Sequence, residues 1–121
     1  MNEIIEKLRS QHALQKAEEK RLKNEIFAIQ RKQGEIVREY CQRLTEQYSQ
    51  YLNKKVTIKR YNGREITGFF CGFIHGYNDL KLEAYVDLAK IKKDGSPAAN
   101  HYKYYDTVEY SENLKLTICD E

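Results

Sequence analysis

The first 52 residues of this 121-residue chain contain no proline and a single glycine, Gly34, and the whole chain contains only one proline. Residues that break helices are therefore missing from this segment, which is rich in the helix formers Glu, Lys, Arg, Gln and Leu. After Leu52 the composition changes to Val, Ile, Tyr, Phe and Gly, which are typical of strands and turns. The change predicts a long helix at residues 1–52 and a small β-domain at residues 53–121.

Other absences narrow the class of protein. No run of about 18 apolar residues and no apolar segment typical of a signal peptide occurs, so we expect neither a membrane span nor secretion. The three cysteines, Cys41, Cys71 and Cys119, are odd in number and widely spaced, unlike a disulfide framework. The net charge of +3 permits contact with nucleic acid without being strongly basic. These features predict a reduced, cytoplasmic protein with no membrane partner.

Motifs that carry catalysis are also missing. There is no Gly-rich phosphate loop with a lysine, no dinucleotide fingerprint and no metalloprotease helix signature. Cys71, His75, His101 and Cys119 offer thiol and imidazole ligands, but no close Cys-x-x-Cys pair accompanies them, as structural zinc sites require. Cys71 is flanked by Gly and Phe in a predicted strand, which indicates a buried thiol rather than a nucleophile. We expect no catalytic residue, no metal and no cofactor, and therefore no enzyme.

The helix carries an apolar stripe with the seven-residue spacing of a coiled coil. His12, Gln15 and Glu19 interrupt it, which weakens a simple parallel dimer but can also fix register. Beyond Gly34 the stripe widens and its spacing approaches 3.6, which predicts that the last turns pack on the β-domain. We assign oligomerisation, with a homodimer favoured, to Ile5, Leu8, Leu22, Ile26, Ile29 and Ile36.

Two alternatives to this long paired helix are less consistent with the sequence. A helix folded back as a hairpin needs a turn sequence, and none interrupts residues 3–50. A helix lying on a membrane surface needs one basic face, whereas the charges here alternate in sign.

The β-domain begins with a hairpin signal. Residues 55–60 alternate between polar and apolar, Asn62-Gly63 supplies a turn, and residues 65–73 form the returning strand. Gly68 and Gly72 inside that strand predict a bend or bulge. Further strands are predicted at 80–91, 101–110 and 114–118, with turn formers at 92–97 and 111–113. The predicted fold class is α+β, a long N-terminal helix followed by a small, strongly bent, five-stranded antiparallel β-barrel.

Residues 56–84, VTIKRYNGREITGFFCGFIHGYNDLKLEA, resemble the first motif of the Sm-like family. They share its alternating strand, its Asn-Gly turn, the glycine in a bent second strand and an Asn before a Leu-x-Leu strand. Ile74 stands where the family usually has an aspartate, and YYDTVEYSENLKLTI has no Arg-Gly of the second motif. The resemblance implies a helix preceding a bent small β-barrel that binds nucleic acid.

Basic residues interleaved with Tyr61, Tyr77 and His75 occur around the predicted hairpin and the loops that follow it. Lysine and arginine bind phosphates, and aromatic rings stack on the bases of single strands. The alternatives are solvated strand faces that protect sheet edges, and a protein-interaction adaptor or inhibitor of the mobile-element or phage accessory type. That adaptor would use a surface formed by Tyr102, Tyr104 and Tyr105. The candidate contacts to RNA, DNA or a protein are Lys55, Lys59, Arg60, Arg64, His75, Tyr77, Asn78, Lys92 and Lys93.

Overall fold

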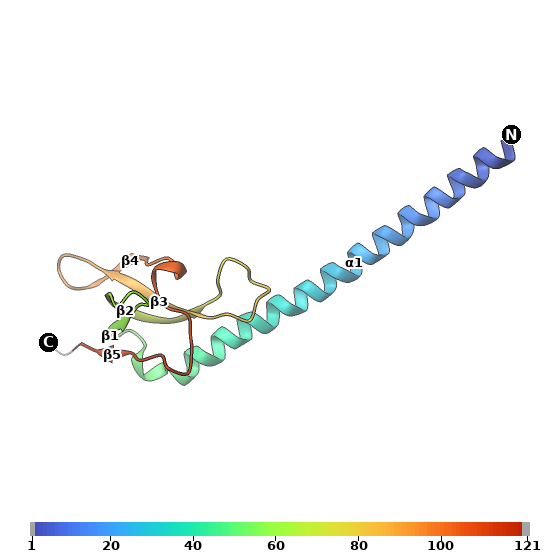
Figure 1. Ribbon diagram of the computed structural model, residues 1–121. Coiled ribbons are helices and arrows are strands. Elements are labelled where there is room, and N and C mark those ends of the chain that lie inside the picture. The colour runs from blue at the N-terminus through green and yellow to red at the C-terminus, as the bar shows by residue number, and fades with distance from the viewer. Residues whose placement is uncertain (1, 120–121) are drawn as a thin grey trace. The chain divides into compact units, whose positions relative to one another are not determined.

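The computed structural model describes residues 2–119 (Figure 1). It contains one long helix and a five-stranded antiparallel sheet, which confirms the α+β class. No described helix combines the length and the apolar character needed to cross a membrane. The elements in chain order are α1 (Asn2–Gln47), the 3-10 turn η1 (Ser49–Tyr51), β1 (Lys55–Lys59), β2 (Glu65–Ile74), β3 (Tyr85–Ile91), β4 (Pro97–His101), the 3-10 turn η2 (Tyr104–Asp106) and β5 (Thr117–Ile118).

Helix α1 is continuous over 46 residues, so the helical-hairpin alternative is wrong. The cause is the lack of helix breakers, supported by ion pairs along the helix surface such as Lys23–Glu19 at 3.0 Å and Arg21–Glu25 at 2.7 Å. The chain divides into two compact units, one ending at Gln33 and one beginning at Gly34. The second unit therefore contains the last turns of α1 together with the sheet.

The core of the second unit combines that helical segment with strands β1, β2 and β3. Val37, Cys41 and Leu44 are buried, and their i, i+4, i+7 spacing places them on one face of the helix. The change of periodicity after Gly34 predicted this packing. The other buried members of the same apolar cluster are Val56, Ile58, Phe70, Phe73, Ala84, Val86, Leu88 and Val108.

The hairpin predicted from Asn62-Gly63 is confirmed. Strands β1 and β2 pair in antiparallel register, and the Arg60 amide donates to the Arg64 carbonyl at 2.7 Å. Gly63 has a φ of 81°, the left-handed conformation that glycine adopts without steric cost. The expected bulge in the second strand is also present, because the β2–β3 register shifts between Phe70 and Gly72.

The predicted barrel is wrong, because the sheet is not closed. Its strand order is β4-β3-β2-β1-β5, and no ladder among residues 2–119 joins β4 to β5. Strand β5 has only two residues, because Ser111, Glu112 and Asn113 form a turn in which the Leu114 amide donates to the Ser111 carbonyl at 3.0 Å. The chain before β5 therefore leaves the sheet instead of closing it.

Two of the expected strands also differ from the structure. The third begins at Tyr85 rather than at residue 80, because the Asn78 side chain accepts from the Leu80 amide at 2.9 Å and holds a turn. The segment 101–110 is not one strand, since η2 interrupts it. Directly after η2, the Thr107 hydroxyl donates to the carbonyl of Val86 in β3 at 2.7 Å.

Candidate functional site

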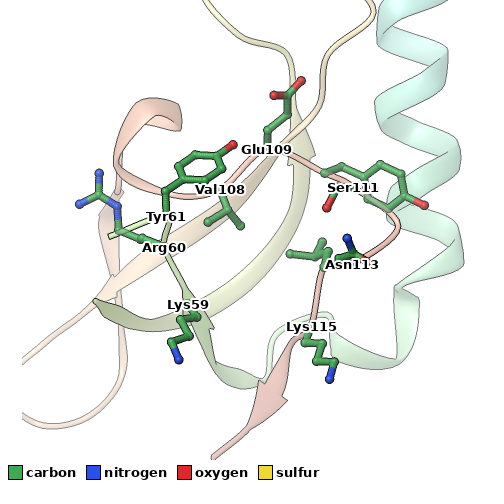
Figure 2. A pocket seen from close by; sticks show the side chains of 10 residues that line it. Lys59, Arg60, Tyr61, Val108, Glu109, Ser111, Asn113 and Lys115 are labelled. Atoms are coloured by element: carbon green, nitrogen blue, oxygen red, sulfur yellow. The ribbon is translucent and has the colours of Figure 1, made fainter. Parts of the chain in front are cut away.

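The open edge of β1 forms a pocket. The β5 ladder covers only the first part of β1, where Thr57 pairs with Thr117 and the Cys119 amide donates to the Lys55 carbonyl at 2.9 Å. A continued ladder would place Lys59 opposite Lys115, but no backbone hydrogen bond between described residues joins them. The chain turns away there and leaves a pocket of about 360 Å³ between residues 59–61 and 108–115 (Figure 2). We call it the β1-edge pocket.

The β1-edge pocket combines positive charge with hydrogen-bonding groups. Lys59, Arg60 and Lys115 supply three cations against the single carboxylate of Glu109. In Figure 2 the amino groups of Lys59 and Lys115 lie on one side of the opening, and the Glu109 carboxylate lies on the other. The remaining lining residues are Tyr61, Val108, Tyr110, Ser111, Asn113 and Leu114. An anionic group is therefore favoured on the lysine side of the pocket.

Aromatic rings border this pocket. Tyr61, two residues after the end of β1, is 87% exposed. Arg60 donates through its guanidinium to the Tyr105 carbonyl at 3.4 Å, which links the pocket to η2. Beside it, Tyr104 lies with its ring centroid 5.0 Å from that of Tyr85 and 5.3 Å from that of Tyr105. We call Tyr85, Tyr104 and Tyr105 the tyrosine cluster.

The structure separates the predicted contacts into groups at two ends of the sheet. Lys59, Arg60 and Arg64 surround the β1–β2 turn. The β3–β4 turn lies at the same end, because the strands are antiparallel, and it carries Lys92 and Lys93. The β2–β3 loop with His75, Tyr77 and Asn78 lies at the opposite end, and Lys55 begins β1.

Two polar side chains of the β2–β3 loop make hydrogen bonds within the loop. His75 Nδ1 donates to the Gly76 carbonyl at 2.8 Å, and the Asn78 side-chain oxygen accepts from the Leu80 amide. Tyr77 in the same loop is 92% exposed. These contacts indicate that His75 and Asn78 shape the loop.

Cys41 and Cys71 are placed unfavourably for nucleophilic chemistry. Burial, followed by the nearby Asp87 carboxylate, raises the pKa of the Cys71 thiol, and burial raises the pKa of Cys41. Both remain protonated near neutral pH, which lowers their reactivity. His101 Nδ1 contacts Asp87 Oδ1 at 2.7 Å. Within residues 2–119 no group of three or more His, Cys, Asp or Glu side chains is arranged to hold a metal ion.

Sequence reasoning did not single out Lys115, Glu109 or Asn113. They belong to the chain between η2 and β5, which reaches β1 only through the tertiary fold. The one local signal was the turn sequence at Ser111–Asn113, which indicated that a strand ends there. This signal did not indicate that the residues around the turn lie next to the end of β1.

Comparisons with protein-family models, with curated proteins and with solved structures found no match to this chain. The resemblance of residues 56–84 to the first Sm-like motif stays a prediction. The functional interpretation rests on the geometry and chemistry of the site.

Proposed function

We propose that this chain is a non-catalytic, self-associating module that binds single-stranded nucleic acid at the β1-edge pocket. The observation that carries the proposal is that Lys59, Arg60 and Lys115, from two separate segments, line one pocket next to the exposed Tyr61. Cationic grooves that track the backbone, combined with rings on which bases stack, are the common design of proteins that bind single strands.

The distribution of charge in the pocket suits a nucleotide. A phosphate is attracted to the side formed by Lys59 and Lys115 and repelled from Glu109. The Glu109 carboxylate and the Asn113 amide can accept hydrogen bonds from the exocyclic amino groups of bases. Tyr61 offers the stacking surface, and its exposure leaves room for a base against the ring.

Salt dependence tests the phosphate contacts. We expect the triple variant K59A/R60A/K115A to bind a fluorescein-labelled single strand more weakly than the unmodified chain. Its slope of log affinity against log salt should be smaller by about 2, since each lost phosphate contact in a single strand reduces it by about 0.7. The matched control K20A/R31A/K81A removes the same charge at exposed positions outside the pocket. Equal slopes for the two triple variants would refute binding at this pocket.

Tyr61 and Tyr77 provide a second, independent comparison. Both rings are almost fully exposed, at 87% and 92%, so neither Y61A nor Y77A removes core packing. Loss of a base stacked on an aromatic ring costs about 1–3 kcal/mol of binding free energy. We expect that loss for Y61A and none for Y77A. The reverse result would move the interface to the β2–β3 loop, where the sequence also predicted contacts.

A second candidate function is a protein-interaction adaptor, favoured by the tyrosine cluster. Tyr105 is 56% exposed within this group of edge-to-face rings, and exposed aromatic groups are typical of interface hot spots. Binding through this surface should change little with salt and should be lost in Y105A, whereas K59A/R60A/K115A should retain it. An unmodified chain that binds no single strand even at low salt would favour this function.

A further inference from the structure

The N-terminal unit consists of a helix that has no core. Every residue from Asn2 to Ile29 is exposed, including the apolar ones. The six seam residues from Ile5 to Ile36 are 45% to 59% exposed and span about 47 Å of helix at 1.5 Å per residue. Most helical stability in proteins comes from packing an apolar face, so this stripe requires a partner. We call it the seam.

The charges beside the seam are sorted by sign. Ile5 and Ile26 are at heptad position a, and Leu8 and Leu22 are at position d. The positions directly after d form one column beside the seam, which is basic, and the positions directly before a form the other, which is acidic or neutral. The sorting ends before Gln30 and Lys32, which are the next members of the two columns. The column after each d residue contains Arg9, Lys16 and Lys23, and the column before each a residue contains Gln11, Glu18 and Glu25.

This sorting distinguishes the two orientations of a pair of identical helices. In a parallel pair each column faces the other column of the second copy, so Glu18 of one chain meets Lys23 of the other. In an antiparallel pair each column faces itself, so basic residues oppose basic residues and carboxylates oppose carboxylates. A hydrogen bond from Arg21 holds the pKa of Glu18 below its ordinary value, which keeps this carboxylate charged at neutral pH.

From this charge pattern we infer that residues 5–36 pair in parallel with a second copy of this chain. The inference rests on the self-association in the proposed function and adds its orientation and the Glu18–Lys23 contacts. It places the two second units after the same end of the paired helices, because each chain leaves the coiled coil at its C-terminal end. The paired assembly therefore contains two β1-edge pockets.

The polar residue Glu19 in the middle of the seam is compatible with this pairing. Two copies of Glu19 face each other in a parallel pair, which by itself is repulsive. In each helix, however, Lys23 lies 3.0 Å and Lys16 lies 3.9 Å from the Glu19 carboxylate. Each carboxylate therefore has two cations of its own chain beside it, which offsets the repulsion and leaves Glu19 to fix the register.

Cross-linking of introduced cysteines tests the orientation. In a parallel pair the two copies of position 8 face each other, within disulfide reach. We expect L8C to form a cross-linked dimer under mild oxidation and S10C, on the opposite face of the helix, to form no more than the unmodified chain. An antiparallel pair instead brings position 8 close to position 33. A mixture of L8C and Q33C chains that cross-links only as 8–33 pairs would overturn the inference.

The mass measured by light scattering distinguishes an antiparallel dimer from a chain that does not self-associate. A dimer with 8–8 cross-links supports the parallel pair. A dimer with 8–33 cross-links overturns the orientation and leaves self-association intact, whereas a monomer overturns both. Binding of a labelled strand, measured on the same samples, tests the pocket independently of either result.

An exchange of charges gives a second measurement. E18K and K23E should each raise the dimer dissociation constant about tenfold, because each places like charges opposite each other twice per pair. The double variant E18K/K23E restores opposite charges across the parallel interface and should recover most of that loss. A double variant weaker than either single one would overturn the Glu18–Lys23 contact.

Discussion

Gly72 is the residue at which the bent strand and the helix meet within the second unit. It has a φ of 113°, and a Cβ atom placed there would lie 2.8 Å from the Thr45 side chain. The Thr45 hydroxyl donates to the Cys41 carbonyl at 2.8 Å and accepts from the Phe73 amide at 3.0 Å. One hydroxyl therefore joins the helix backbone to the strand immediately after the bulge, and only glycine leaves it room.

Replacement of this glycine should destabilise the second unit strongly. We expect G72A to lower the free energy of unfolding by about 3 kcal/mol, since backbone strain adds to displacement of Thr45. The control G63A has a similar positive φ but nothing within 4 Å of its new Cβ, so it should cost only about 1 kcal/mol. All ten tyrosines lie after Gly34, so tyrosine fluorescence in urea follows this unit alone. Equal losses in both variants would contradict the close-contact explanation.

Asp94 makes the β3–β4 turn sensitive to acid. Its carboxylate accepts hydrogen bonds from the Ser96 hydroxyl and from the Ser96 amide, the latter at 3.0 Å. These bonds, the hydroxyl first, lower the pKa of Asp94 below its ordinary value of 3.8. A lowered folded-state pKa means that the stabilisation is complete above 3.8 and is lost as the pH falls through the folded value. The NMR chemical shift of the Ser96 amide should therefore change as the pH is lowered below 3.8. In D94N, which has no carboxyl group at position 94, this change should be absent.

The surface of the helix changes from exposed to buried between two adjacent residues. Ile36 is 59% exposed and belongs to the seam, whereas Val37 is 2% exposed and belongs to the core of the second unit. Successive helical residues differ by about 100° in direction, so a single turn can serve both surfaces. Gly34, where the second unit begins, lies directly before this change.

Substitutions on the two faces should have separable effects. L44A removes a side chain that is 5% exposed in the core and should destabilise the second unit by about 2–5 kcal/mol. I36A should leave that stability within about 0.5 kcal/mol and should weaken dimerisation instead. Tyrosine fluorescence in urea measures the first effect and light scattering over a dilution series measures the second. A large loss of stability in I36A would show that the two faces are not independent.

The elements that could be predicted are those encoded by short stretches of sequence. Asn62-Gly63 sets the first hairpin, and Gly72 sets the bulge, because turn and bulge geometry depends on a few neighbouring residues. Closure of a sheet depends instead on whether its two edge strands, which are distant in the sequence, pair with each other. The barrel was predicted from the local bend in β2, but within the described residues the edge strands β4 and β5 do not pair.

The same distinction applies to the candidate site. Lys59 and Arg60 could be identified from sequence because they end a predicted strand beside a turn. Lys115 could not, because its place in the same pocket as Lys59 follows from the path of the chain after η2. His75 and Tyr77 were grouped with the basic residues from composition, yet β2 carries them to the other end of the sheet.

At the scale of the whole molecule, the proposed pairing would compensate for a small site. One β1-edge pocket of about 360 Å³ would contact only a few nucleotides of a strand in the proposed function. A parallel pair presents two such pockets, so a strand long enough to reach both binds the second at a high effective concentration. Affinity then increases with strand length without any additional contact within a pocket.

Ile26 and Phe27 allow this gain to be tested by single substitutions. Ile26 is 52% exposed in the seam, and its neighbour Phe27 is 61% exposed outside it, so I26D should yield a monomer and F27D should remain a dimer. Both should bind a short strand of about 6 nucleotides as the unmodified chain does, because the pocket is unchanged. On a strand of about 40 nucleotides, I26D should bind at least about tenfold more weakly and F27D should not, because only paired chains bind bivalently. Anisotropy titrations measure the affinity for each strand, and light scattering measures the mass of each variant. A monomeric I26D with full affinity for the long strand would mean that each pocket acts alone.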